Sequence, residues 1–144
     1  MNTTGAAIAS AVVFVWLGMV MAISFLEAPL KFRAPGVTIP VGLGIGRLVF
    51  RALNIAETVL AVAVAVAVTV GAGGPPRSLA VLTGVLVALL VVQLGVVRPR
   101  LNRRSDRVLA GEDLPRSRGH LHYVALEAVK VVLLIALGVG LSAH

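Results

Sequence analysis

The chain has 144 residues, of which 58% are hydrophobic and 13% are charged, and its formal net charge at pH 7 is +7. Soluble domains carry about 25% charged residues, so the composition argues against a soluble domain, and the absence of cysteine excludes disulfides, thiol redox chemistry and cysteine-ligated clusters. A positive net charge is also typical of nucleic-acid-binding proteins, but here membrane topology explains it, and no nucleic-acid partner is expected.

The apolar residues form four blocks, at residues 6–30, 41–70, 79–97 and 121–141. Each block supplies the roughly 20 residues that a helix needs to cross about 30 Å of hydrocarbon. A soluble four-helix bundle would show polar residues at a helical period, and long parts of these blocks show none. The sequence therefore predicts an all-α membrane protein in which residues 1–144 form one domain, a four-transmembrane-helix bundle with helices at 6–30, 42–70, 79–97 and 120–141.

The first predicted helix, residues 6–30, ends in a polar turn. Glu27 lies four residues before Lys31, and Pro29 stands between them, where its missing N–H would loosen the helix end. Trp16 lies inside the helix and is expected to make ordinary lipid or packing contacts. No basic residue precedes the apolar block, so this segment is expected to span the membrane rather than to be a cleaved signal peptide.

A turn-rich segment, residues 34–40, leads into the second helix and is followed by Gly42, Gly44 and Gly46. A phosphate-binding glycine loop would need a preceding strand and a different spacing. Small residues in membrane proteins more often allow helices or loops to approach closely. These three glycines are therefore interpreted as packing positions.

The second helix begins with polar residues, namely Arg47, Arg51, Asn54 and Glu57. They are spaced by four, three and three residues, and such spacings predict one helical face. Together with the end of the first helix, this face is predicted to form one wall of a polar pocket near one side of the membrane.

The third helix has one polar interruption, Gln93. It leads into the only long hydrophilic segment, residues 98–119, within which residues 105–113 are expected to form a short helix on the membrane surface.

In the fourth helix, His120, Tyr123 and Glu127 share a face through their spacings of three and four residues. Lys130 lies three residues beyond Glu127 and is predicted to pair with it, whereas His122 points away from this face.

Polar residues from all four helices are predicted to lie at one depth, namely Glu27, Glu57, Gln93 and Glu127. Each stands a few residues inside a polar boundary, which at 1.5 Å per residue places them roughly 6–11 Å below the same membrane face. A charge in the membrane costs about 3 kcal/mol at the helix centre. The glutamates are therefore expected to face one another, the arginines or a bound ligand rather than lipid.

Four spans place the connections near residues 31–41 and 98–119 on the same side of the membrane. That side carries most of the basic residues, namely Lys31, Arg33, Arg47, Arg51 and seven arginines of residues 98–119, whereas the other side carries Arg77. The positive-inside rule then predicts a bacterial inner-membrane protein with both connections in the cytoplasm and both termini outside. The basic connection either sets the orientation only or also attracts anionic lipid headgroups.

Several functions are open for the polar cluster. It could bind an ion, a metal or a headgroup in a small accessory protein, acting as a homo-oligomer or as a subunit of a membrane complex. It could belong to an oligomeric proton- or cation-coupled transporter or to an interfacial enzyme, or its ion pairs could serve only to fix the helices. The binding candidates are Glu27, Arg47, Arg51, Asn54, Glu57, Gln93, Tyr123 and Lys130.

A divalent metal ion is the candidate cofactor, with Glu57, His120 and Glu127 as its candidate ligands. Di-metal carboxylate bundles use Glu-x-x-His pairs, and the chain has no such pair. The apolar residues 61–70, 79–92 and 131–141 offer almost no polar lining for a path across the membrane. This favours a one-sided binding site over a transporter.

Two stretches, residues 26–57 (LEAPLKFRAPGVTIPVGLGIGRLVFRALNIAE) and residues 120–130 (HLHYVALEAVK), resemble a group of uncharacterised bacterial four-helix membrane proteins with a domain of unknown function. They cover about a third of the chain. The resemblance implies the four-helix membrane fold and no particular activity. The small multidrug exporters also have four short helices and a glutamate in the first, but theirs lies mid-helix, whereas Glu27 lies at the helix end.

Overall fold

The computed structural model of the chain describes residues 3–70, 74–111 and 119–143. These residues are almost all helical and include no strand, which confirms the all-α prediction for the described part of the chain. In chain order the elements are α1 (Thr3–Val20), the π-helix η1 (Met21–Glu27), α2 (Ala28–Leu30), the 3-10 helix η2 (Lys31–Arg33), α3 (Ile39–Thr69), α4 (Arg77–Val92), the π-helix η3 (Gln93–Val97), α5 (Arg98–Leu109) and α6 (Gly119–Ser142).

The helical elements join into four rods that are long and apolar enough to cross a membrane, as expected of a multi-pass membrane protein. Three of them are longer than predicted, because they run over Thr3–Arg33, Ile39–Thr69 and Arg77–Leu109. The largest difference is in the third rod, where η3 and α5 continue α4 without a break. Residues 105–109 therefore belong to this rod and not to a separate surface helix, while residues 112–113 lie outside the described part.

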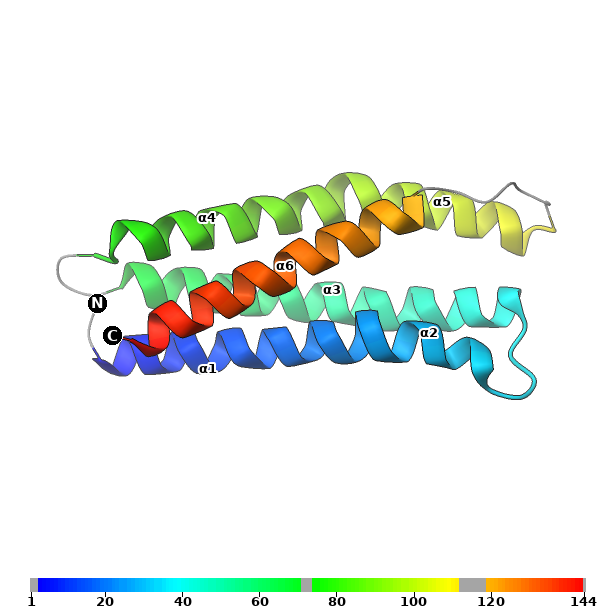
Figure 1. Cartoon of the computed structure of the whole chain (residues 1–144). Helices are drawn as coiled ribbons and strands as arrows, with labels where there is room; N and C mark the ends of the chain where they lie inside the picture. Colours follow the sequence, from blue (N-terminus) through cyan, green and yellow to red (C-terminus); the bar gives the residue numbers. More distant parts are fainter. Residues whose placement is uncertain (1–2, 71–73, 112–118, 144) are drawn as a thin grey trace.

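The rods form an up-and-down bundle with two different ends (Figure 1). The start of α1, the end of α3, the start of α4 and the end of α6 lie at one end, which we call the terminal end. The connection from η2 to α3 and the last turns of α5 lie at the other, which we call the basic end because it carries Lys31, Arg33, Arg47 and the arginines of α5. The asymmetry of charge predicted from the sequence thus separates the two ends of the bundle.

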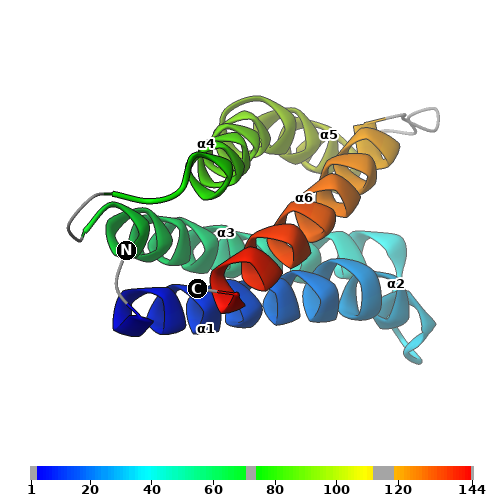
Figure 2. The ribbon, with the colours of Figure 1, turned by 60° about the vertical axis from the view of Figure 1, so that its left-hand side comes forward.

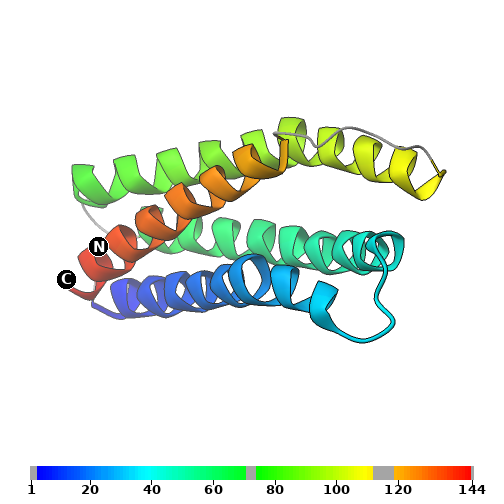
Figure 3. The same cartoon turned by 45° about the vertical axis from the view of Figure 1, so that its right-hand side comes forward.

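The fourth rod packs against the first and the third. The helix α6 packs against α1 and α4, and α1 also packs against α3. Figure 2 and Figure 3 show that α6 crosses the bundle obliquely, from α5 at its start to the beginning of α1 at its end. Contacts between α3 and the third rod are sparser, and the arginine groove described below lies between them.

The core of the terminal half is almost wholly apolar. Its side chains interdigitate from all four rods and include Ala9, Val13, Val64, Val68, Leu79, Leu86, Leu134, Leu137 and Leu141. The outer surface is apolar as well, since Val59, Val62 and Val132 are each about 60% exposed. Such a surface suits lipid chains rather than water.

Each of the two π-helical segments ends two residues before a proline. The segment η1 ends at Glu27 and Pro29 follows, and η3 ends at Val97 and Pro99 follows. A proline lacks the N–H of a helical hydrogen bond and clashes with the carbonyl four residues earlier, and a wider π turn relieves this conflict. Both segments also carry side chains of the buried polar network described below, so they decide where these side chains point.

The glycines that precede Arg47 are only partly used for packing. Gly42 lies against the ring of Phe32, and a side chain at Gly46 would come within 2.9 Å of the Lys31 Nζ atom. The packing prediction is therefore confirmed for these two. Gly44 has no neighbour within 4 Å of an added Cβ and instead borders the groove.

Candidate functional site

Most of the polar residues that were predicted to form one cluster lie in two separate places. The first, which we call the core network, is buried inside the bundle and consists of Trp16, Ser24, Glu57, Gln93, Glu127 and Lys130. The second, which we call the arginine groove, is open at the side of the bundle and is lined by Gly44, Arg47, Leu48, Arg51, Asn54, Ile55, Thr58, Leu94, Arg98, Asn102 and Leu109.

Lys130 is the centre of the core network. Its Nζ atom lies 2.6 Å from Glu57 Oε2, 2.6 Å from Glu127 Oε1 and 2.7 Å from Gln93 Oε1. These three contacts match the three donors of an ammonium group. The side chain has no exposed surface, so its charge is compensated entirely by these neighbours. The predicted pairing of Lys130 with Glu127 is confirmed, and Glu57 joins it from α3.

The remaining contacts of the network reach the first and third rods. The indole Nε1 of Trp16 donates to Glu57 Oε2 over 2.8 Å, the Ser24 hydroxyl donates to Glu127 Oε2 over 2.6 Å, and Gln93 Nε2 donates to Glu127 Oε1 over 2.8 Å. Among the described residues, Glu57 Oε1 is the one buried side-chain oxygen of the network without a hydrogen-bond partner. The network therefore ties all four rods together at one level.

The prediction that Glu57 shares a helical face with Arg47 and Arg51 is wrong. Six residues separate Arg51 from Glu57, which places them about 120° apart around a regular α-helix. The Glu57 side chain is completely buried, whereas Arg51 is exposed and lines the groove. The face towards the third rod thus carries Arg47, Arg51 and Asn54, and the glutamate faces the bundle interior.

Glu27 also lies apart from the core network. Its Oε2 atom is 3.8 Å from Lys31 Nζ, one turn further along the rod, and it accepts no hydrogen bond from the described residues. Lys31 Nζ lies 5.5 Å and 5.7 Å from the ring centroids of Phe32 and Phe50. Three of the four side chains that were predicted at one depth therefore meet, and Glu27 does not join them.

The candidate metal ligands Glu57 and Glu127 both bind Lys130 in this structure. The side chain of the third candidate, His120, lies outside the described part. Within the part of the chain that the structure describes, no three His, Cys, Asp or Glu side chains come together as a metal site would need. An ammonium group thus occupies the position between the carboxylates, and the donors fit a buried ion pair.

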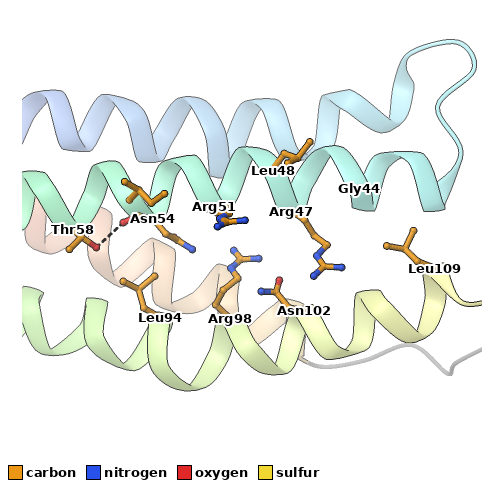
Figure 4. Close-up of a pocket in the computed structure, with 11 residues that line it drawn as sticks. Gly44, Arg47, Leu48, Arg51, Asn54, Thr58, Leu94, Arg98, Asn102 and Leu109 are labelled. Atoms are coloured by element: carbon orange, nitrogen blue, oxygen red, sulfur yellow. Dashed lines mark hydrogen bonds between the residues drawn. The ribbon is translucent and has the colours of Figure 1, made fainter.

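The arginine groove is a side opening of about 780 Å³ between α3 and the third rod, on the basic half of the bundle (Figure 4). From α3 come Arg47, Arg51 and Asn54, and from the third rod come Arg98 and Asn102. Arg98 extends from the third rod toward α3, on which Arg51 lies. The groove therefore brings polar donors of two rods into one open space.

Arg98 is fixed in the groove by two aromatic rings. Its guanidinium carbon lies 4.6 Å from the ring centroid of Phe50 and 4.4 Å from that of Tyr123, distances typical of cation–π contacts. The two rings meet edge to face, with their centroids 5.6 Å apart. Tyr123, which was predicted as a binding residue, is only 5% exposed, so it supports Arg98 from behind and does not line the groove.

The cations of the groove differ in their partners. Arg47 forms an ion pair with Asp106 of α5. Arg51 forms no hydrogen bond or ion pair with the residues that the structure describes, and the Nε and Nη2 atoms of Arg98 are buried without a hydrogen-bond partner there. Buried unpaired polar atoms are uncommon and need an explanation. Two of the three arginines that line the groove thus lack a carboxylate partner among the described residues.

Some members of both places were missed from the sequence. Trp16 was predicted to make ordinary lipid or packing contacts. It is buried in the core, and nothing near it in the chain indicates that its indole also meets Glu57, 41 residues away. Arg98 was predicted only to add charge to the basic side, and Asn102 was predicted only to belong to the hydrophilic segment 98–119. Their spacing of four residues in one helix is a signal that they share a face, and it could have indicated their place beside each other in the groove.

Comparisons of the chain with protein-family models, with curated proteins and with solved structures find no match. The resemblance to the bacterial four-helix group stays a prediction, so function is inferred from the geometry of the chain itself.

Proposed function

We propose that the chain is a small bacterial inner-membrane protein that binds an anionic group in the arginine groove, at the cytoplasmic face. The observation that carries this proposal is the pair Arg51 and Arg98, which line the groove from α3 and α5 with no carboxylate partner among the described residues. Like charges repel, and a bound anion between them would remove the repulsion.

The chemistry of the lining suits phosphate or carboxylate groups. A guanidinium presents its N–H donors in a planar fork that matches the oxygens of either group. Asn54 and Asn102 add amide donors on both sides of the groove. Because Arg98 is already held by Phe50 and Tyr123, little of its side-chain freedom remains to be lost on binding.

The core network connects the two rods between which this site lies. It joins α3, through Glu57, to the third rod, through Gln93, and both contacts run through Lys130. These two rods form the walls of the groove. We therefore assign the network to positioning the walls rather than to binding.

The distribution of polar residues favours a one-sided site over a transport path. A transporter would need polar groups from the groove to the terminal end, and the buried core there consists almost wholly of apolar side chains such as Val68, Leu86 and Leu137. An interfacial enzyme using Tyr123 would need that side chain in the groove, whereas it packs behind Arg98.

The experiment is thermal denaturation of the purified protein in a neutral detergent, in phosphate and in chloride at equal ionic strength. The variants are Arg51→Gln, which removes an exposed groove cation, and Arg100→Gln, which removes an exposed cation outside the lining. We expect phosphate to raise the Tm of the wild type and of Arg100→Gln, because a ligand of the native state stabilises it. An unchanged phosphate effect in Arg51→Gln would contradict the proposal.

A further inference from the structure

We propose that the ligand of the arginine groove is a membrane lipid that ends in a phosphate monoester. Its phosphate lies between Arg51 and Arg98, and its chain leaves the groove past Ile55, Thr58 and Leu94 toward the bilayer. This assignment rests on the anion-binding function proposed above and specifies the class of anion.

The charge of the groove selects the headgroup. Arg47 is paired with Asp106, which leaves the guanidinium groups of Arg51 and Arg98 to be matched by the ligand. A phosphate monoester carries a charge of about −1.5 to −2 at pH 7, which nearly neutralises the two positive charges of these guanidinium groups. The phosphodiester of common lipids carries a single charge and leaves one guanidinium uncompensated.

The shape of the groove indicates that a chain is attached to the phosphate. Along α3 the lining changes from Arg47 and Arg51 near the basic end to Ile55 and Thr58, about 10 Å deeper along the axis. Leu94 faces this deeper part from the third rod (Figure 4). A free phosphate compound would use only the arginine part and leave the deeper part of the groove unfilled.

The groove is also continuous with the lipid-facing surface. One turn beyond Thr58, Val62 is 59% exposed on α3. A chain that follows the deeper part of the groove therefore reaches the bilayer without crossing a polar barrier. The lipid can enter from the side, which a ligand dissolved in water would not require.

Three probes test separately whether the ligand has a phosphate monoester and whether it has a lipid chain. The purified protein in a neutral detergent is titrated with dioleoyl phosphatidate, dioleoyl phosphatidylglycerol or glycerol 3-phosphate, and the bound probe is counted by native mass spectrometry. We expect one phosphatidate per chain, bound about tenfold or more tightly than either other probe, because one additional charged hydrogen bond gives about that factor.

A matched pair of variants tests the path of the chain. Thr58→Trp fills the deeper part of the groove, and Val59→Trp places the same bulk on the neighbouring exposed surface of α3, outside the groove lining. We expect Thr58→Trp to weaken phosphatidate binding about tenfold and to leave glycerol 3-phosphate binding unchanged. Val59→Trp should bind both like the wild type.

The outcomes distinguish this inference from the function on which it rests. Equal binding of phosphatidate and phosphatidylglycerol would overturn the monoester assignment. Glycerol 3-phosphate binding as tight as that of phosphatidate would overturn the lipid assignment, while anion binding would stand. If no probe binds to the wild type, both are wrong. The comparison of probes on the wild type holds even if Thr58→Trp fails to fold.

Discussion

Two cations of this chain have buried nitrogen atoms, but the surroundings of these atoms differ. Lys130 has three close oxygen partners and no exposed surface. Arg98 is held by the rings of Phe50 and Tyr123, yet two of its nitrogens have no hydrogen-bond partner among the described residues. A cation with all donors satisfied stabilises a structure, and a fixed cation with free donors is prepared to bind. At the residue scale, this contrast separates the core network from the groove.

Replacing the central lysine should destabilise the whole bundle. Lys130→Met leaves Glu57 and Glu127 buried without their cation, and breaking a buried ion pair in this way costs about 3–5 kcal/mol. We expect a clear fall in the Tm of the detergent-solubilised protein. A matched variant, Lys130→Met with Glu57→Gln and Glu127→Gln, removes the stranded charges and should recover most of the loss. A Tm of Lys130→Met equal to that of the wild type would refute the central role of this side chain.

Releasing the paired arginine should strengthen anion binding. In Asp106→Asn, Arg47 loses its carboxylate partner and becomes available to a ligand in the groove. Because this ion pair is largely exposed, its competition is weak, and we expect phosphate to bind about two- to fivefold more tightly. Titration of both proteins with inorganic phosphate, followed by thermal shift, measures this. Weaker binding in Asp106→Asn would show that the carboxylate helps to build the site.

Contacts between residues close together in the sequence could be predicted from their spacing, whereas contacts between different rods could not. The Lys130 pair with Glu127 follows from a separation of three residues in one helix. The indole partner of Glu57 could not be predicted, because it requires knowledge of which rods meet and at what height. The predicted grouping of Glu57 with Arg51 is wrong, because around a regular α-helix Arg51 lies about 40° to one side of Arg47 and Glu57 lies about 80° to the other side.

Among the elements, the two π-helical segments have the largest effect on the direction of the side chains in the core network. The segment η1 carries Ser24, and η3 begins with Gln93, and both side chains bind Glu127. A π turn shifts the phase of the helix, so these side chains point to a different direction than in a regular α-helix. The prolines that follow were visible in the sequence, but only Pro29 was interpreted, and the turn itself was not predicted.

Close contact between α1 and α6 depends on a glycine. A Cβ atom at Gly138 would lie 2.8 Å from the ring of Phe14, whereas one at Gly18 on α1 would meet nothing within 4 Å. We expect Gly138→Val to lower the free energy of unfolding by about 1–3 kcal/mol through overpacking. The control Gly18→Val should stay close to the wild type in the same thermal denaturation. Equal stability of the two variants would show that the helices are not tightly apposed at this point.

At the scale of the whole molecule, polar side chains are distributed unevenly along the bundle. The terminal half has an apolar core, the core network lies near the middle of the rods, and the groove lies in the basic half. The four-span fold could be predicted from the sequence, because every backbone polar group in lipid must be satisfied and long apolar blocks then have to be helices. The groove could not, because Arg51 and Arg98 are brought together only by the packing of two rods.

The difference between the two ends predicts how the protein lies in the membrane. Basic residues gather at one end, and the positive-inside rule places that end in the cytoplasm. We expect a reporter enzyme fused after His144 to be active only outside the cytoplasm. The control is a fusion within residues 112–118, which should give the cytoplasmic signal. A cytoplasmic signal from the C-terminal fusion would invert the orientation and place the groove at the outer face.

The measurement that tests the central claim most directly is the position of a bound lipid. A phosphatidate with a photoreactive group near its phosphate is cross-linked to the protein in phosphatidylcholine nanodiscs, and the labelled residues are mapped by mass spectrometry. The arginine groove predicts labels on residues 47–58 of α3 and 94–102 of the third rod, which unlabelled phosphatidate removes by competition. Labels spread evenly over the lipid-facing surface, or unaffected by the competitor, would contradict a specific site in the groove.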